Sequence, residues 1–285
     1  MKIQYLGTAA AEGWPALFCN CEHCETARIL GRKNIRTRSQ TAIYANEVGS
    51  GTTDEILLID LPPDTYLHVL QHGLRLDKIA HLVITHSHDD HFKPSELIYR
   101  CGIYANPVPN FTLNIYGNEK VHDLYKKTMQ ELDTDQWPTN IKFHVVEPFK
   151  PFSAGNFTVT PLLALHDITE QCFIYMIELA NKRLLYANDT GIFPTETFNY
   201  IANKPFDTIS LDCTSCGHKE GTNHMGLPDA LEVKRRLEGL KCIKDTTKII
   251  LTHFSHNGGT CYDAMLDLAE PHNFEVAFDG AVWNV

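Results

Sequence analysis

The sequence predicts an α/β fold in which two β-sheets pack face to face and helices cover the outside. Short apolar runs typical of buried strands alternate with amphipathic runs of helical period. Six of the apolar runs end in a histidine or an aspartate, as expected where strand ends converge on a functional site. The 285 residues can bury a sizeable core, so we expect a single domain over residues 1–285.

The strand patterns begin at the N-terminus. Residues 1–6 form a short apolar pattern, and residues 41–45 and 55–60 flank residues 49–53, whose glycines predict a hairpin turn. The remaining apolar runs cover residues 82–86, 162–166, 184–189, 209–212 and 249–253. Each of these runs ends in a potential metal ligand, and we expect their ends to converge on one place.

Helix patterns lie between the strands. Residues 118–132 place Val121, Leu124, Tyr125 and Met129 on one apolar stripe. Residues 227–240 begin with a proline in the first turn, where its missing N–H is tolerated. Shorter helices are predicted over residues 66–72, 194–201 and 262–269.

Composition narrows the function classes. The net charge is −10, whereas a protein that follows a nucleic-acid backbone usually presents a basic face, so nucleic acid is not the expected partner. The densest basic stretch, residues 28–38, is interpreted as a solvated helix and loop. No apolar run spans a membrane and the start lacks a signal-peptide pattern, so we expect a cytoplasmic protein. Nine cysteines, an odd number, argue against a disulfide framework.

The densest chemical signal is the segment His86-Ser-His88-Asp89-Asp90-His91, which follows a buried-strand pattern. Imidazole and carboxylate groups bind divalent ions such as Zn, Mn and Fe. Because alternate residues of a strand point to opposite faces, His86 and His88 can share an ion only if the chain turns after the strand. Asp90 and His91 then lie on that turn and can face a second ion. The segment predicts a metal site that needs further ligands from elsewhere.

This motif resembles the signature of the metallo-β-lactamase superfamily, and His166, Asp189 and His253 follow in the order that this superfamily uses. The resemblance implies a metallo-β-lactamase-type αββα sandwich with a two-metal site along one edge. A closer resemblance, over nearly the whole chain, is to the phosphodiesterases that open phosphoribosyl 1,2-cyclic phosphate in the bacterial carbon–phosphorus lyase pathway. The segments that carry it are Gly7-Thr-Ala-Ala10, Cys19-Asn-Cys21-Glu-His-Cys24, Asp189-Thr-Gly191, Leu211-Asp-Cys213, Asn223-His224, His253-Phe-Ser-His256 and Phe278-Asp-Gly280.

The resemblance implies two ligand sets joined by one carboxylate. The first set is His86, His88 and His166, the second is Asp90, His91 and His253, and Asp189 bridges them. Two ions about 3.5 Å apart need such a carboxylate and a bridging hydroxide to tolerate their repulsion, and the hydroxide would attack phosphorus. Asp189 also suits a turn, and the two roles can coexist. We expect Mn, Zn or Fe at both positions, since imidazole and carboxylate ligands do not rank these ions.

Further residues are assigned to the chemistry. Asp60 and Asp212 also end strand patterns and are expected to orient ligand imidazoles. The family pattern places His224 near the substrate, where it would protonate the leaving oxygen. His218 is the competing acid. Residues 102–137 are expected to shape the substrate pocket.

The cysteine cluster points to a separate ion. Cys19, Cys21 and Cys24 with His256 would form a closed Cys3His site, which is typical of structural zinc. His23 is an alternative fourth ligand. Such a site would attach the N-terminal loop to the strand end that carries His253, three residues before His256.

Together these features predict a dinuclear metal phosphodiesterase for a small cyclic phosphodiester, either a phosphoribosyl cyclic phosphate or a cyclic nucleotide. Asp90, Asp189 and His224 are the predicted catalytic residues. Two alternatives stay open: an RNA-processing endonuclease of the superfamily, and a non-hydrolytic relative of the pyrroloquinoline quinone pathway protein. A β-lactamase is disfavoured because no export signal is seen, and a redox diiron protein because it normally has Glu where His88 stands. No membrane partner is expected, and a homodimer is left open.

Overall fold

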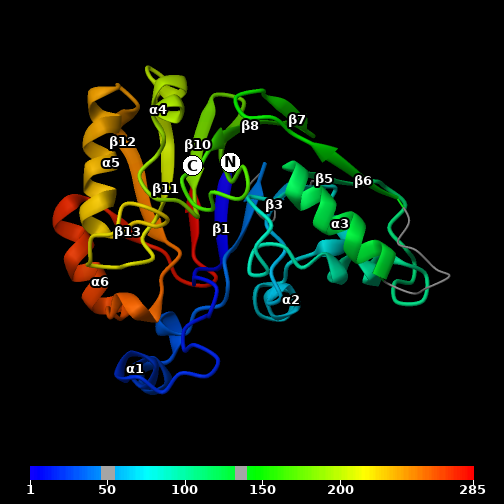
Figure 1. The fold of residues 1–285 in the computed structure, drawn as a ribbon, viewed down its shortest axis with the longest axis horizontal. Coiled ribbons are helices and arrows are strands. Elements are labelled where there is room, and N and C mark those ends of the chain that lie inside the picture. Colours follow the sequence, from blue (N-terminus) through cyan, green and yellow to red (C-terminus); the bar gives the residue numbers. More distant parts are fainter. Residues whose placement is uncertain (46–54, 132–139) are drawn as a thin grey trace.

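The computed structural model describes residues 1–45, 55–131 and 140–285. Within these ranges the strands form two seven-stranded sheets that face each other (Figure 1). The first contains, in spatial order, β14 (Val282–Asn284), β1 (Lys2–Gly7), β2 (Gln40–Tyr44), β3 (Ile56–Ile59), β4 (His81–Val83), β5 (Leu113–Gly117) and β6 (Ile141–Val145). The second contains β13 (Glu275–Val276), β12 (Ile243–Thr252), β11 (Phe206–Asp212), β10 (Lys182–Ala187), β9 (Phe173–Leu179), β8 (Phe157–Leu163) and β7 (Phe152–Ala154).

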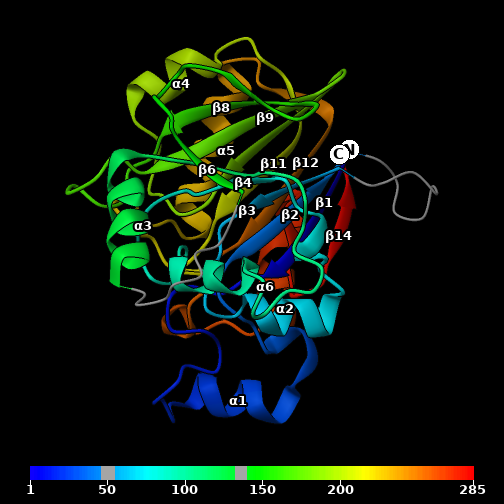
Figure 2. The ribbon, with the colours of Figure 1, turned by 90° about the vertical axis from the view of Figure 1, so that its right-hand side faces the viewer.

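Helices cover the outer faces of both sheets, so the predicted α/β class is confirmed (Figure 1). On the side of the first sheet lie α2 (Thr65–His72) and α3 (Glu119–Glu131). On the side of the second lie α4 (Thr195–Ile201), α5 (Leu227–Gly239) and α6 (Tyr262–Ala269). These helices match the predicted ones to within one residue at either end. A further helix, α1 (Glu22–Leu30), stands apart from both sheets (Figure 2).

The core follows the two-residue period of the strands. In β3, Leu57 and Ile59 pack between the sheets, whereas Ile56 and Leu58 pack beneath the helices of the first sheet. All four are buried, because both faces of this sheet are covered. Aromatic side chains of the second sheet, including Tyr175, fill the middle of the sandwich. The strands are therefore fixed in register, and the loops at their ends have a rigid base.

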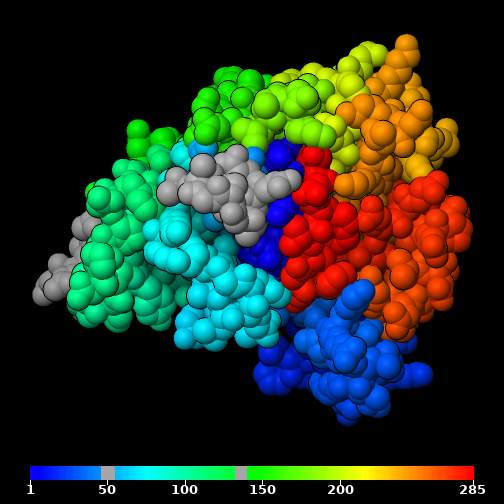
Figure 3. Space-filling view, turned by 180° about the vertical axis from the view of Figure 1, so that it is seen from behind, coloured from blue at the N-terminus to red at the C-terminus, as the bar shows by residue number. Residues whose placement is uncertain are grey.

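The chain ends lie side by side. β1 pairs antiparallel with β14, so the C-terminal strand lies along the N-terminal one (Figure 3). β2 and β3 also pair antiparallel, although the predicted hairpin turn at residues 49–53 lies outside the described residues. None of the helices in residues 1–45, 55–131 and 140–285 has the length and apolar character needed to cross a bilayer.

One expectation about the basic stretch is wrong. Arg36 is buried, not solvated: its guanidinium lies 4.3 Å from the centre of the Phe254 ring and donates to Thr8 Oγ1 and to the carbonyl of Ala277, each at 2.7 Å. A planar guanidinium can stack and donate at the same time, which allows burial of the charge. The residue ties the N-terminal loop to the end of the chain.

Candidate metal centre

Loops from both sheets meet at one edge of the sandwich. β4 in the first sheet leads into the His86–His91 segment, and β8, β10 and β12 in the second lead into His166, Asp189 and His253. The strands end one to three residues before these side chains, earlier than the apolar runs suggested. The backbone has left the ladder at each of these points, and this allows side chains from different strands to point at one another.

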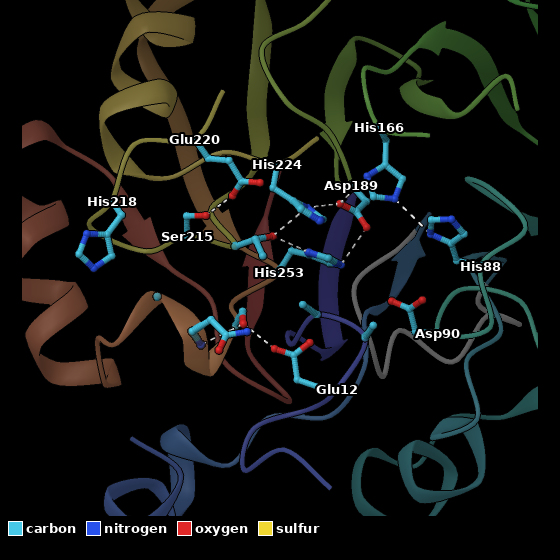
Figure 4. Close-up of a pocket in the computed structure, with 16 residues that line it drawn as sticks. Glu12, His88, Asp90, His166, Asp189, Ser215, His218, Glu220, His224 and His253 are labelled. Carbon is cyan, nitrogen blue, oxygen red and sulfur yellow. Dashed lines mark hydrogen bonds and ion pairs between the residues drawn. The ribbon is translucent and has the colours of Figure 1, made fainter. Parts of the chain in front are cut away.

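The first ligand set forms a compact cluster. Nδ1 of His88 lies 3.0 Å from Nε2 of His86 and 3.2 Å from Nε2 of His166 (Figure 4 shows the latter pair). Three imidazole nitrogens around one tetrahedral zinc ion are about 3.3 Å apart, so the spacing suits a three-histidine site. Burial, helped by the neighbouring His91, holds the pKa of His86 well below its usual range. The neutral imidazole that a metal ligand requires is thus favoured.

The second ligand set is entirely buried and consists of Asp90, His91, Asp189 and His253. Nε2 of His91 lies 3.2 Å from Oδ2 of Asp90, and Nε2 of His253 lies 3.4 Å from Oδ2 of Asp189. Neither Nε2 atom has a hydrogen-bond partner of suitable geometry. Buried polar atoms are normally paired, so these two nitrogens are available as ligands for a cation. The donor set fits a divalent metal ion.

Asp189 lies between the two clusters. Its Oδ2 faces His91 at 3.5 Å and His253 at 3.4 Å, while its Oδ1 lies 3.5 Å from Nδ1 of His166. Oδ1 is closer still to Nδ1 of His224, at 2.6 Å. The carboxylate thus reaches the second cluster directly and the first only through the edge of His166. Its bridging role stays a prediction.

The far nitrogens of the candidate ligands have fixed partners. Nδ1 of His91 lies 2.7 Å from Oδ2 of Asp60, and Nδ1 of His166 lies 3.1 Å from the carbonyl oxygen of Asn223. Nδ1 of His91 can donate to the carboxylate and Nδ1 of His166 to the carbonyl oxygen, which would leave each Nε2 as the free acceptor. Asp60 is therefore placed where it was expected to be.

Asp212 differs from its expected role. Its Oδ2 lies 3.6 Å from Nδ1 of His253, whereas the hydroxyl of Thr214 lies 2.8 Å from the same nitrogen. Oδ1 of Asp212 instead accepts the backbone N–H groups of Thr214 and Met225. Asp212 shapes the loop, and Thr214, which sequence reasoning missed, contacts the imidazole.

His224 sits against Asp189. Its Nδ1 lies 2.6 Å from Asp189 Oδ1 and 3.3 Å from Asp212 Oδ2. Burial opposes the charge on this imidazole, but the two carboxylates outweigh burial and raise the pKa of His224 to about 11. His218 lies apart from Asp189 (Figure 4). Of the two candidate acids, only His224 contacts the carboxylates of the cluster among the described residues.

A pocket of about 600 Å³ opens over the clusters. Its lining comprises Ala10, Ala11, Glu12, His88, Asp90, His166, Asp189, Thr214, Ser215, His218, Glu220, His224, His253, Ser255, Asn257 and Gly258. No residue from 102–131, the described part of the segment expected to shape the pocket, belongs to this lining. β5 lies beside β4 in the first sheet, but Asn118, which follows β5, contacts Glu170 in the loop that carries His166 and does not line the pocket.

The cysteine cluster forms as expected, with His256 as its fourth member. Nδ1 of His256 lies 3.4 Å from Sγ of Cys21 and 3.8 Å from Sγ of Cys19, and Cys24 belongs to the same group. Sulfur and nitrogen ligands of one tetrahedral zinc ion are about 3.6 Å apart. A backbone hydrogen bond from Cys24 and the contact with His256 lower the pKa of Cys21 to about 6, which favours the thiolate. His23 packs near Gly259 and is not in the group.

Known proteins share this architecture. Residues 57–254 match the model of the β-lactamase superfamily domain. The Probable metallo-hydrolase YhfI of Bacillus subtilis is 26% identical over 223 residues, which cover 75% of this chain and 83% of that protein.

Two solved structures show the same fold over the full length. The crystal structure of a new diphosphatase from the PhnP family gives a TM-score of 0.73 at 19% identity, covering 100% of this chain and 97% of that one. Zn²⁺-bound PqqB from Methylobacterium extorquens gives 0.74 at 19% identity, covering 100% of both chains. The αββα sandwich implied by the motifs is thereby confirmed, and the chain belongs to the β-lactamase superfamily.

Proposed function

We propose that the protein is a hydrolase that uses two divalent metal ions to cleave a small cyclic phosphodiester. The observation that carries the proposal is the pair of neighbouring clusters, His86–His88–His166 and Asp90–His91–Asp189–His253, five of whose seven residues line one pocket. When bound, two such ions would supply Lewis-acid stabilisation of negative charge and would acidify a water molecule at neutral pH. The metallo-hydrolase relative supports hydrolysis as the reaction class.

Three side chains have proposed roles in holding an ion and in transferring a proton. Asp90 and Asp189 would hold the second ion, and Asp189 also fixes His224 through the 2.6 Å contact at Nδ1. With Nδ1 held between two carboxylates, Nε2 is the nitrogen left to give a proton to the leaving oxygen. His224 is partly exposed, with 24% of its side chain accessible, so a substrate in the pocket can reach it. We therefore retain Asp90, Asp189 and His224 as the proposed catalytic residues.

The pocket suits a small substrate. Its volume of about 600 Å³ lies within the range of small-molecule sites and accommodates a sugar or nucleoside cyclic phosphate. Glu12 and Glu220 also line it and can accept hydrogen bonds from sugar hydroxyls. The net charge of −10 disfavours a long nucleic-acid backbone as substrate. The proposed partner is thus a small phosphodiester, and a cytoplasmic location and the oligomeric state stay predictions.

A third ion has a structural role in this proposal. Cys19, Cys21, Cys24 and His256 offer no open position to a substrate once they surround an ion, which is typical of structural zinc. The backbone N–H of Ala10 donates to the carbonyl of Phe254 beside this group. The zinc would therefore stabilise the loop that carries His253.

The test is a substrate screen with the metal-reconstituted protein. Candidates are 1,2-, 2′,3′- and 3′,5′-cyclic phosphates of ribose and nucleosides, linear diesters and a structured RNA. We expect turnover of at least one cyclic phosphate and its loss in Asp189→Ala. Cleavage of RNA without cyclic phosphates would favour the endonuclease alternative. Absence of both activities, with only one tightly held zinc ion bound, would favour the non-hydrolytic binding protein.

A further inference from the structure

The loop between β8 and β9 contacts the first ligand set, which consists of His86, His88 and His166. Oδ2 of Asp167 lies 3.3 Å from Nε2 of His88. Three residues further along, Oε1 of Glu170 accepts the backbone N–H of Ser87 at 3.1 Å and its hydroxyl at 2.7 Å. The same loop also carries His166 itself. One short segment therefore supplies one candidate ligand and contacts the residue that supplies another.

The two carboxylates are themselves anchored. The backbone N–H of Thr169 donates to Asp167 at 2.7 Å, and Asn118 donates to Glu170 at 2.9 Å. Lys120 donates to the hydroxyl of Thr169 at 2.7 Å. Asn118 lies directly before α3 and Lys120 lies in its first turn, so the beginning of this helix fixes the loop.

His88 needs such support more than the other members of its cluster. Its side chain is 42% exposed, whereas that of His166 is 7% exposed and residue His86 is 1% exposed. Packing alone leaves an exposed imidazole free to rotate and to exchange its tautomer. A carboxylate at Nε2 favours the tautomer with hydrogen on Nε2, and this tautomer presents the Nδ1 lone pair to the cluster.

We infer that Asp167 is a positioning residue that orients His88 in the first ligand set, and that Glu170 stabilises the same segment by holding Ser87. The inference rests on metal binding by the proposed clusters. His88, Asp167 and Glu170 are close enough to hold a cation of their own. However, N–H and O–H donors from Thr169, Ser87 and Asn118 already occupy both carboxylates, which favours positioning over a third cation site.

The test compares Asp167→Ala and Asp167→Asn with wild type in the full-length, metal-loaded protein. Asp123, an exposed carboxylate on α3 that pairs with Lys126, gives the matched control Asp123→Ala. Metal content is measured by elemental analysis after dialysis against graded chelator, and the Co²⁺-substituted proteins are compared by their absorption spectra. Thermal melting of each variant reports any general loss of stability.

Asp167→Ala should weaken one exchangeable ion by about 10- to 100-fold, leave the other ion and the tight zinc in place, and change the Co²⁺ spectrum. Asp167→Asn should recover most of this affinity, because its amide oxygen can still accept from Nε2–H. Metal retention by Asp167→Ala equal to that of wild type would overturn the inference. Binding of a third exchangeable ion that Asp167→Ala abolishes would replace it with a cation site.

These readouts do not depend on the substrate. If wild type binds two exchangeable ions but hydrolyses no phosphodiester, the proposed function fails and the positioning test still stands. If wild type binds no exchangeable ion, both fail. Equal loss of melting temperature and of all ions in the Ala and Asn variants would identify a merely structural role.

Discussion

Nδ1 of His91, a member of the second ligand set, lies 2.7 Å from Oδ2 of Asp60, and both side chains are buried. Asp60 in turn accepts the backbone N–H of Thr85 at 2.8 Å, so the carboxylate is tied to the strand end that precedes the metal motif. The contact orients an imidazole whose other nitrogen has no hydrogen-bond partner. Asp60, which is not a member of either ligand set, therefore fixes the orientation of the His91 imidazole.

Replacing Asp60 by Ala should weaken one exchangeable ion by about 10- to 100-fold, because the His91 ring loses the group that fixes its orientation. Competition with a chelator followed by elemental analysis measures the change. Asp64→Ala is a suitable control, because Asp64 pairs with Arg38 and does not contact a candidate ligand. Equal metal retention by the two variants would contradict the role given to Asp60.

Replacing His224 by Gln should lower kcat for a cyclic phosphate by about 100- to 10,000-fold, because the leaving alkoxide loses its proton donor. With bis-p-nitrophenyl phosphate the loss should be much smaller, since p-nitrophenolate leaves without a proton. Metal content should not change. His218→Gln is the matched variant, and a larger loss there than in His224→Gln would reverse the assignment of the acid.

The protein should hold three ions, of which a chelator removes two quickly. In Cys21→Ser the tight zinc should be lost, and the melting temperature should fall because the loop beside His253 loses its anchor. The unclustered Cys261 provides the control Cys261→Ser. Retention of the tight zinc by Cys21→Ser would show that the ion is bound elsewhere.

Gly191 allows a close approach between two site loops. A Cβ at this position would lie 1.7 Å from the carbonyl oxygen of Thr222, and the Gly191 N–H donates to the carbonyl of Leu165 at 2.7 Å. Gly191→Ala should therefore displace the loop that carries His224, with a loss of about 1–3 kcal/mol in the free energy of unfolding.

The matching measurements for Gly191→Ala are urea unfolding and steady-state kinetics, and we expect kcat to fall at least tenfold with metal content preserved. Gly239 at the end of α5 has nothing within 4 Å of an added Cβ, so Gly239→Ala should leave both quantities nearly unchanged. Wild-type kcat in Gly191→Ala would argue that the loop adapts.

The site residues that could be predicted from the sequence share one property: their neighbours in the sequence identify them. His86, His166 and His253 follow apolar runs, and the cysteines recur at short spacing. The paired-sheet fold could be predicted for the same reason, because strand and helix periods are local patterns. The resemblance to the family then implied how these strands and candidate ligands are arranged in one fold.

Residues that depend on distant partners could not be found in this way. Glu170 holds Ser87 across 83 positions, and Arg36 contacts Ala277 across 241 positions. Nothing next to Thr214 in the sequence shows that its hydroxyl meets His253. A charged or hydroxyl residue in a polar loop is usually solvated, so its partner becomes evident only when the sheets have packed.

The distribution of the ligands over the two sheets has a consequence for how the protein matures. Each cluster combines side chains that follow β4 with side chains that follow strands of the other sheet, such as His166 after β8 and His253 after β12. Neither half of the chain holds a complete ligand set. If the clusters bind ions as proposed, the first ion needs the loop after β8, which carries His166, and the second also needs β12, which precedes His253. Each bound ion would then link segments of the chain that are synthesised at different times.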